Sequence, residues 1–450
     1  MTDRNAGEDT IAAVATAPGR GAVSIVRVSG RDAVAVAGRV VGTLPPPRQA
    51  ALKPFHDAGG NVIDRGIVLH FPAPRSYTGE DVVELQGHGG RVVTDMVLGA
   101  LLVAGARGAE PGEFSRRAYL NGRIDLAQAE AVADLIDAAT ETAARAAQRS
   151  LSGAFSERVS ALSEAIQEVR ARVEGALDFS DEDAAWFGPQ LEAAFERVTQ
   201  ELEELLRNAG QGRRFTEGCV IALAGQPNVG KSTLLNRLSG TDVAIVTEIA
   251  GTTRDVLRES INLGGMAVTL VDTAGLRDSS DDPVELEGVR RARKAFKASE
   301  MILYLVDART GLDAEDRREW QALPSSVPRL LVYNKIDILA TSDEKALPEG
   351  ASGISAATGA GMDALVAQIH QRLGIEGETP AYSARSRHLR ALQQTQLHVE
   401  QARTLLGAAH ELELVAEELR LARCAVDEIC GRSTTEDLLG HIFAGFCIGK

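Results

Sequence analysis

The stretch from Gly225 to Ser232 fits the phosphate-loop pattern G-x-x-x-x-G-K-[ST] at every fixed position. The apolar run at 219–224 predicts a strand before it, and the amphipathic run at 232–238 predicts a helix after it. In such a loop, glycines let backbone N–H groups close around phosphate oxygens at a helix N-terminus. Lys231 would add a positive charge and Ser232 a ligand for Mg²⁺. The sequence therefore predicts a nucleoside triphosphate site here, rather than a chance glycine-rich turn.

Two more predicted strand ends indicate which nucleotide binds. The strand at 266–271 leads into Asp-Thr-Ala-Gly at 272–275, where the Asp can hold the magnesium shell and the Gly N–H can sense the γ-phosphate. The strand at 329–333 leads into Asn-Lys-Ile-Asp at 334–337, whose last carboxylate can accept two N–H bonds from guanine. Adenine would lose both bonds, each worth about 1.5 to 3 kcal/mol, so the motif favours GTP. The order of motifs is completed by Ser355, Ala356 and Ala357.

A hydroxyl-rich loop at 247–255 predicts the first switch, with Thr253 as the second magnesium ligand. The second switch starts at Leu276, whose alkyl side chain cannot orient water as the glutamine of Ras-type enzymes does. The acidic run at 278–287 offers replacements, and the side-chain oxygen of Asn228 could ligate a monovalent cation near the β,γ-bridge. A cation there would stand where an arginine finger does, an effect of about 10³ to 10⁵ in rate.

Composition limits the class of protein. A length of 450 residues suggests about three domains, and 44% hydrophobic with 25% charged residues is typical of a globular chain. Residues 1–15 lack the features of a secretory signal, and no apolar run reaches transmembrane length. Four cysteines without C-x-x-C spacing argue against structural zinc or a disulfide framework. We therefore expect a cytoplasmic protein with no membrane contact, and the net charge of −15 disfavours nonspecific coating of nucleic acid.

The residue composition and the spacing of apolar residues change three times along the chain. Residues 1–122 read as a small α+β domain, with strands at 22–28, 66–71 and 81–85 and a helix at 92–104. Its polar clusters, expected at strand ends and in loops that line a binding site or form ordinary turns, are 18–21 with Arg27, 76–81, 86–90 and 111–117.

Helical spacing begins near residue 123. The predicted helices cover 126–178, with an interruption at 152–153, then 190–208, 385–408 and 412–429, and 211–215 reads as a linker. We place the first half of a helical domain at 123–216, the nucleotide domain at 217–374 and the second helical half at 375–450. The nucleotide domain is thus predicted to be inserted into a helical domain whose two halves pack together.

Taken together, the motifs resemble the MnmE (TrmE) family of tRNA-modification GTPases, within the Era-like branch. The resemblance covers essentially the whole chain. The stretches that carry it are Pro18–Gly21, Thr78–Asp81, Glu84–Gly90, Pro111–Phe114, Asp125–Glu130, Gly225–Ser232, Gly251–Asp255, Asp272–Leu276 and the terminal Cys447–Lys450.

The resemblance implies a multidomain α/β plus all-α fold. It implies an N-terminal α+β domain that binds folate and mediates dimerisation, a split helical domain, and an inserted Ras-like P-loop G domain activated by pairing with its twin around K⁺. The implied cofactors are Mg²⁺, K⁺ and 5-formyl-tetrahydrofolate or a related folate. The implied chemistry adds an aminomethyl or carboxymethylaminomethyl group to C5 of the tRNA wobble uridine. A homodimer would act with an FAD-dependent partner of the MnmG type in a heterotetramer.

The resemblance also implies the roles of particular residues. The potassium positions are Asn228, Thr247, Ile249 and Thr252, and the magnesium ligands are Ser232 and Thr253. Catalysis is assigned to Lys231, Asn228 and Glu285, although Pro283 looks like an extra residue in that loop. The GTP-contacting set is completed by Val229, Gly230, Thr233, Glu248, Ala250, Gly251, Asp272, Thr273, Ala274, Gly275, Asn334, Lys335, Asp337, Ser355, Ala356 and Ala357.

The folate positions are Arg27, Glu84, Arg123 and Lys450. The arginines and the lysine suit the glutamate carboxylates of folate, and Glu84 could accept N–H bonds from the pterin. The family more often carries lysine at the position of Arg123. Cys447 is a candidate nucleophile in the C-terminal tail. We favour a structural or folate-lining role, because nothing in the sequence indicates a lowered thiol pKa.

The main alternative is a non-enzymatic RNA or ribosome assembly switch of the Era or Der kind, which would share the whole nucleotide site. Residues 1–122 weigh against it, since such factors would add a compact RNA-binding module and no basic KH-type patch stands out. A membrane-remodelling GTPase would need a basic amphipathic segment, and none stands out either.

Overall fold

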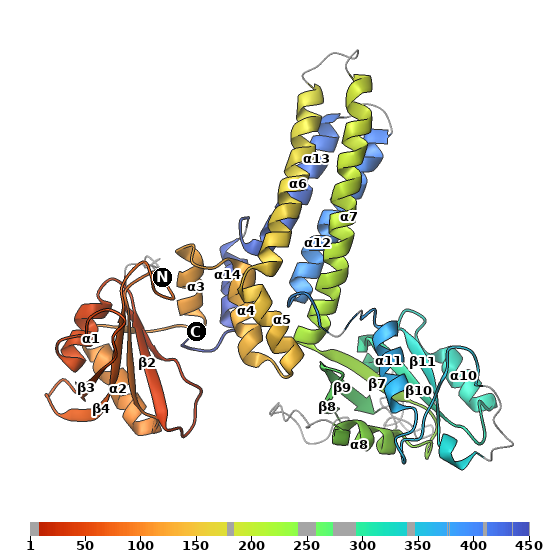
Figure 1. Cartoon of the computed structure of the whole chain (residues 1–450), viewed down its shortest axis with the longest axis horizontal. Coiled ribbons are helices and arrows are strands. Elements are labelled where there is room, and N and C mark those ends of the chain that lie inside the picture. The colour runs from red at the N-terminus through yellow and green to blue at the C-terminus, as the bar shows by residue number, and fades with distance from the viewer. Residues whose placement is uncertain are drawn as a thin grey trace, which may run out of the picture. The chain divides into compact units, whose positions relative to one another are not determined.

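The computed structural model describes residues 9–177, 184–241, 258–272, 294–339, 347–375, 377, 379–407, 412–433 and 435–449. The chain forms two compact units, residues 1–133 with 426–450 and residues 134–425. Figure 1 labels their elements. Among the helices of the described ranges, none is both long and apolar enough to cross a membrane.

The first unit contains a six-stranded sheet in the order β3-β4-β5-β2-β1-β6. All its pairings are antiparallel except that of β1 with β6. Side chains alternate across the strands, so Val26, Val28, Val83 and Leu85 join one core with the two helices α1 and α2. The bounds are β1 Ile11–Val14, β2 Val23–Ser29, β3 Ala51–His56, β4 Val62–Phe71, β5 Val82–His88, β6 Arg107–Gly108, α1 Ala33–Val41 and α2 Arg91–Val103.

The strands and the helix predicted in this unit are confirmed as β2, β4, β5 and α2, with shifted ends. The cluster at 86–90 lies at a strand end, as predicted, but the prediction of a strand end or loop at 111–117 was wrong in part. Residues 86–88 continue β5, and 113–117 form most of α3, Glu113–Leu120. Gly112, at φ +67°, turns the chain into that helix, and a side chain there would collide with the carbonyl oxygen of Phe443.

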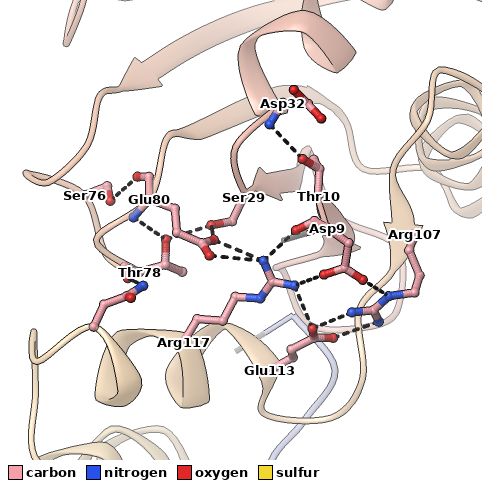
Figure 2. A network of polar contacts seen from close by, with 11 residues as sticks. Asp9, Thr10, Ser29, Asp32, Ser76, Thr78, Glu80, Arg107, Glu113 and Arg117 are labelled. Carbon is pink, nitrogen blue, oxygen red and sulfur yellow. Dashed lines mark hydrogen bonds and ion pairs between the residues drawn. The ribbon is translucent and has the colours of Figure 1, made fainter. Parts of the chain in front are cut away.

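Arg117, on α3, holds residues 113–117 against the rest of the first unit through a network of ion pairs (Figure 2). Its side chain is 5% exposed, and its guanidinium pairs with Asp9 at 2.6 Å, Glu113 at 3.0 Å and Glu80 at 3.2 Å. Arg107 binds Asp9 and Glu113 in turn, at 2.7 and 2.6 Å, and its hydrogen bond keeps the pKa of Asp9 below its usual value. Because a buried charge needs partners, this network ties the polar clusters at 76–81 and 111–117 together.

The second unit contains long helices, which Figure 1 labels. Helix α12, which follows the nucleotide domain in the chain, packs against α7, which precedes it, and α7 also packs against α6. One face of α7 is apolar and buried, at Leu191, Phe195, Val198, Leu202 and Leu205. The helices of the second unit are α5 Glu141–Leu151, α6 Ala154–Leu177, α7 Ala184–Glu217 and α12 Ser386–Gly407. Two helices, α4 Leu126–Asp137 and α13 Leu412–Cys430, contain residues of both units, and α14 Glu436–Ala444 belongs to the first.

The predicted linker at 211–215 was wrong, because α7 continues through it to Glu217. Gly212 lies where the backbone of Tyr382 passes, and a Cβ there would collide with the carbonyl oxygen of Tyr382. Phe215 is buried, and Arg213 pairs with Glu300. Close packing against the returning chain therefore keeps a glycine-containing segment helical.

The nucleotide domain has a six-stranded sheet in the order β12-β11-β10-β7-β9-β8, parallel except for β8. Strand β10 is buried along its whole length, as expected of a parallel strand covered on both faces. The bounds are β7 Cys219–Ala224, β8 Arg258–Leu263, β9 Met266–Asp272, β10 Met301–Asp307, β11 Arg329–Asn334, β12 Ser352–Gly353, α8 Lys231–Thr241, α10 Ala314–Ala322, η2 Ile336–Ile338 and α11 Met362–Arg372.

Gly212→Ala should lower the free energy of unfolding by about 1 to 2 kcal/mol, because steric strain against Tyr382 outweighs the gain in helix propensity. The matched control is Gly210→Ala on the same helix, where a Cβ meets nothing within 4 Å and the change should stabilise by up to about 1 kcal/mol. Urea denaturation of the full-length variants measures both. Equal effects at the two positions would contradict the packing explanation.

Candidate functional site

Four parallel strands bring the predicted nucleotide residues to one edge of the sheet. Leu223 of β7 is in register with Asp272 of β9, and Asp307 of β10 with Asn334 of β11. The phosphate loop starts directly after β7, so it lies at the same edge as these strand ends. Ligands of open α/β sheets bind outside the carboxyl ends of the strands.

Two glycines of the phosphate loop are required by its surroundings. Gly225 has φ +129°, and a Cβ there would collide with the carbonyl oxygen of Leu305. Gly230 has φ +100°, and a Cβ there would collide with the side-chain amide of Asn334. The loop is therefore pressed against β10 and against the end of β11, which leaves its outer side to a ligand.

Lys231 begins α8, and its side chain lies along the loop. It is 5% exposed, and its Nζ donates to the carbonyl oxygens of Gly225 and Gln226, both at 2.8 Å. Ser232 and Thr233 follow in the first turn and are exposed. A helix N-terminus with a lysine and backbone N–H groups attracts phosphate, because donors and dipole both favour negative charge.

Asn334 joins the phosphate loop to residues 355–357, which were predicted to complete the guanine site and are called the guanine loop below. Its Nδ2 donates to the carbonyl oxygen of Val229 at 2.8 Å, and its Oδ1 accepts from the Ala356 N–H at 2.9 Å. Ser355 is fully buried beside Ala356. Asp337 is exposed on η2, where the base of a bound nucleotide could reach its carboxylate.

Sequence reasoning missed two residues of this site. Arg237 of α8 donates its Nε to the carbonyl oxygen of Ala356 at 3.0 Å and also donates to that of Ala357, so it ties the guanine loop to the helix that follows the phosphate loop. Asp307 accepts a hydrogen bond from Lys335 Nζ at 2.8 Å. A carboxylate at the end of a parallel strand was a signal that could have revealed Asp307.

Several predicted positions lie outside the described residues. For Asp272 only the backbone, at the end of β9, is described. The others are Thr247, Glu248, Ile249, Ala250, Gly251, Thr252, Thr253, Thr273, Ala274, Gly275, Glu285 and Lys450.

The donors that are described suit the implied cations. Mg²⁺ prefers oxygen ligands and usually retains substrate phosphates, and the exposed hydroxyl of Ser232 lies next to the phosphate-binding turn. Bound there, the ion would neutralise charge on the phosphates. Asn228 is exposed and held at φ +63°, a left-handed conformation in which its amide oxygen could serve K⁺.

In the first unit, Arg27 and Glu84 are neighbours on β2 and β5. Their side chains meet at 2.9 Å, and the Arg27 guanidinium lies 5.5 Å from the ring centre of Tyr77 and 5.7 Å from that of Phe114. Arg123 packs its alkyl stem next to Gly79. A cation over aromatic rings beside a carboxylate suits a flat heterocycle that carries N–H donors and a negative charge, as the folates do.

The described part of the C-terminal tail lies in the same unit. Ile448 bridges to Pro111, and Gly449 lies so close to the Val14 carbonyl oxygen that only glycine fits. Val14 follows Ala13, the β1 neighbour of Arg27. Cys447 is exposed with a free thiol. The tail thus lies near the predicted folate residues.

A phosphate loop after a central parallel strand, followed by an Asn-Lys-x-Asp motif at a neighbouring strand end, defines a GTP-binding protein of the P-loop class. Two family descriptions match this chain: GTP-binding protein TrmE N-terminus over residues 10–123, and MnmE helical domain over residues 126–447. The chain belongs to the MnmE (TrmE) family of tRNA modification GTPases.

Individual relatives agree with this assignment over the full length. The tRNA modification GTPase MnmE of Dechloromonas aromatica is 50% identical over 98% of this chain and 99% of the relative. That of Nitrosospira multiformis is 47% identical over the same shares. Among solved structures, Era of Aquifex aeolicus is 30% identical and covers 43% of this chain and 68% of its own, with a TM-score of 0.29.

Asp337→Asn should exchange guanine preference for xanthine preference, because an amide donates to the C2 oxygen of xanthine where the carboxylate accepted from guanine. We expect GTP affinity to fall at least about tenfold, because charged hydrogen bonds to guanine are lost. XTP affinity should rise, because the amide gains a hydrogen bond to xanthine. Competition against a fluorescent guanine nucleotide measures both. Asp363→Asn, an exposed carboxylate on α11, is the control, and unchanged selectivity of Asp337→Asn would refute the assignment.

Proposed function

We propose that this chain is a potassium-dependent GTPase that acts in modification of the tRNA wobble uridine. The observation that carries the proposal is the guanine-nucleotide site itself, in which Asn334 links the phosphate loop to the guanine loop. Membership of a family of tRNA modification GTPases supplies the substrate class. The uridine chemistry lies elsewhere, and GTP hydrolysis opens and closes the G domains.

We assign different roles in nucleotide binding to the described residues of the site. The backbone of the loop and Lys231 bind phosphates, Ser232 serves Mg²⁺, and Asp337 selects guanine. Asn228 offers the oxygen for K⁺, with Thr247, Ile249 and Thr252 as its proposed companions. Thr253 would complete the magnesium shell and Glu285 would orient water, so nucleotide binding and hydrolysis would draw on both the rigid loop and the switches.

The carbon unit is proposed to come from 5-formyl-tetrahydrofolate or a related folate. Arg27, Glu84, Arg123 and Lys450 would hold it in the first unit, supported by the ion pair of Arg27 with Glu84 over two aromatic rings. The active assembly would be a homodimer joined by an FAD-dependent partner of the MnmG type, producing an aminomethyl or carboxymethylaminomethyl group at C5. The Era or Der type of assembly switch is disfavoured, because residues 10–123 match the TrmE N-terminus.

Replacing Na⁺ with K⁺ at constant ionic strength should raise GTP turnover at least about tenfold, since a bound cation would act as an arginine finger does. Asn228→Gly removes the amide oxygen while tolerating the left-handed φ of +63°, so it should abolish the difference between the salts and keep nucleotide affinity. Steady-state phosphate release measures turnover. Equal wild-type rates in both salts would remove the cation role.

Arg27→Ala should weaken binding of 5-formyl-tetrahydrofolate at least about tenfold, because the ligand loses a charged hydrogen-bond donor. GTP hydrolysis should stay near the wild-type rate. Calorimetric titration of the full-length chain measures the affinity, with Arg91→Ala as control because that side chain is 91% exposed on α2. Deletion of Lys450 should act like Arg27→Ala, and intact affinity in both variants would count against this folate site.

A further inference from the structure

Asp307, at the carboxyl end of β10, contacts the guanine-recognition motif without belonging to it. Its backbone is in register with Asn334, and its side chain is 11% exposed. Its Oδ2 accepts from Lys335 Nζ at 2.8 Å, and the same Nζ donates to the carbonyl oxygen of Asn228 at 2.7 Å. The lysine ammonium therefore joins a strand-end carboxylate to the phosphate loop.

Both residues linked by this ammonium have unusual backbones. Lys335 has φ +68° and Asn228 has φ +63°, in the left-handed region that side chains rarely adopt. Such conformations persist at functional sites only where the surroundings hold them. A positive φ is unfavourable for Lys335 because it carries a side chain. The hydrogen bonds of its ammonium group therefore help to keep the Asn334–Asp337 turn in place.

The carboxylate of Asp307 stays ionised under working conditions. Arg309 donates its Nε to Oδ1 at 2.9 Å and its Nη2 to Oδ2 at 2.6 Å. These bonds, with that of Lys335, hold the pKa of Asp307 well below its usual range. The side chain of Arg309 is itself 51% exposed, and it donates these hydrogen bonds to the carboxylate of Asp307.

We propose that Asp307 is a positioning residue for the guanine base: it fixes Lys335 against the phosphate loop and thereby orients the turn that presents Asp337. This inference rests on the proposed guanine-nucleotide function. In this proposal, a residue outside the Asn-Lys-x-Asp motif contributes to base recognition. Binding of the base is thereby coupled to the conformation of the phosphate loop.

The test measures release of a fluorescent GDP carrying a methylanthraniloyl group from the full-length chain. Asp307→Asn keeps the size of the side chain but loses its charge, so release should accelerate about tenfold, as expected for a charged hydrogen bond. KM for GTP should rise, and kcat should fall by a smaller factor, because the contact acts on the base directly and on the phosphate loop only through the Asn228 carbonyl oxygen. Asp307→Glu should recover part of the loss, and Arg309→Ala should stay within about twofold of the wild type.

A double variant shows whether Asp307 acts through Lys335. In a Lys335→Ala background, Asp307→Asn should change release by less than about twofold, since residues that act as a unit are not additive. A wild-type release rate in Asp307→Asn, or independent multiplication of the two effects, would overturn the proposal. If thermal unfolding shows that Asp307→Asn does not fold, Asp307→Glu decides: faster release supports the proposal and a wild-type rate overturns it. Failure of the wild type to bind the probe would instead refute the proposed function.

Discussion

The buried amide of Asn334 holds the nucleotide site together. With 2% of its surface exposed, it donates to Val229 in the phosphate loop and accepts from Ala356 in the guanine loop. An amide suits this position because it offers a donor and an acceptor on one rigid plane. The same amide makes Gly230 necessary, since any side chain there would occupy its place. One interaction thus fixes the relative position of the phosphate and base ends of the site.

A second buried group has the corresponding role in the first unit. Arg117 gathers Asp9, Glu80 and Glu113 around one guanidinium, so segments from both ends of the N-terminal domain meet at α3. Such a network costs much to break, because each lost partner leaves a charge without compensation. It lies next to the strands that carry Arg27 and Glu84, since Ser29 of β2 donates to Glu80 at 2.7 Å. The pair proposed to bind folate therefore projects from a firmly held sheet.

Contiguous motifs were predictable from the sequence, and contacts between distant residues were not. The phosphate loop and the strands beside it followed from local spacing, and the structure has β7, β9 and β11 where the sequence predicted strands. The roles of Arg237 and Asp307 depend on partners far along the chain, so the strand-end position of Asp307 was visible in the sequence but these contacts were not. The segment at 211–215 looked like a linker by composition, but packing against Tyr382 made it helical. Tertiary contacts outweighed local propensity there.

The account connects a guanine-specific site to tRNA modification, and the chemistry of the wobble base tests that connection most directly. The measurement is mass analysis of tRNA nucleosides from cells that lack this chain, with re-expressed wild-type and Asp337→Asn chains for comparison. We expect the C5 aminomethyl-type group to disappear, to return with the wild type and to return poorly with the variant. An unchanged modification profile in cells without the chain would contradict the account and favour a role in RNA or ribosome assembly.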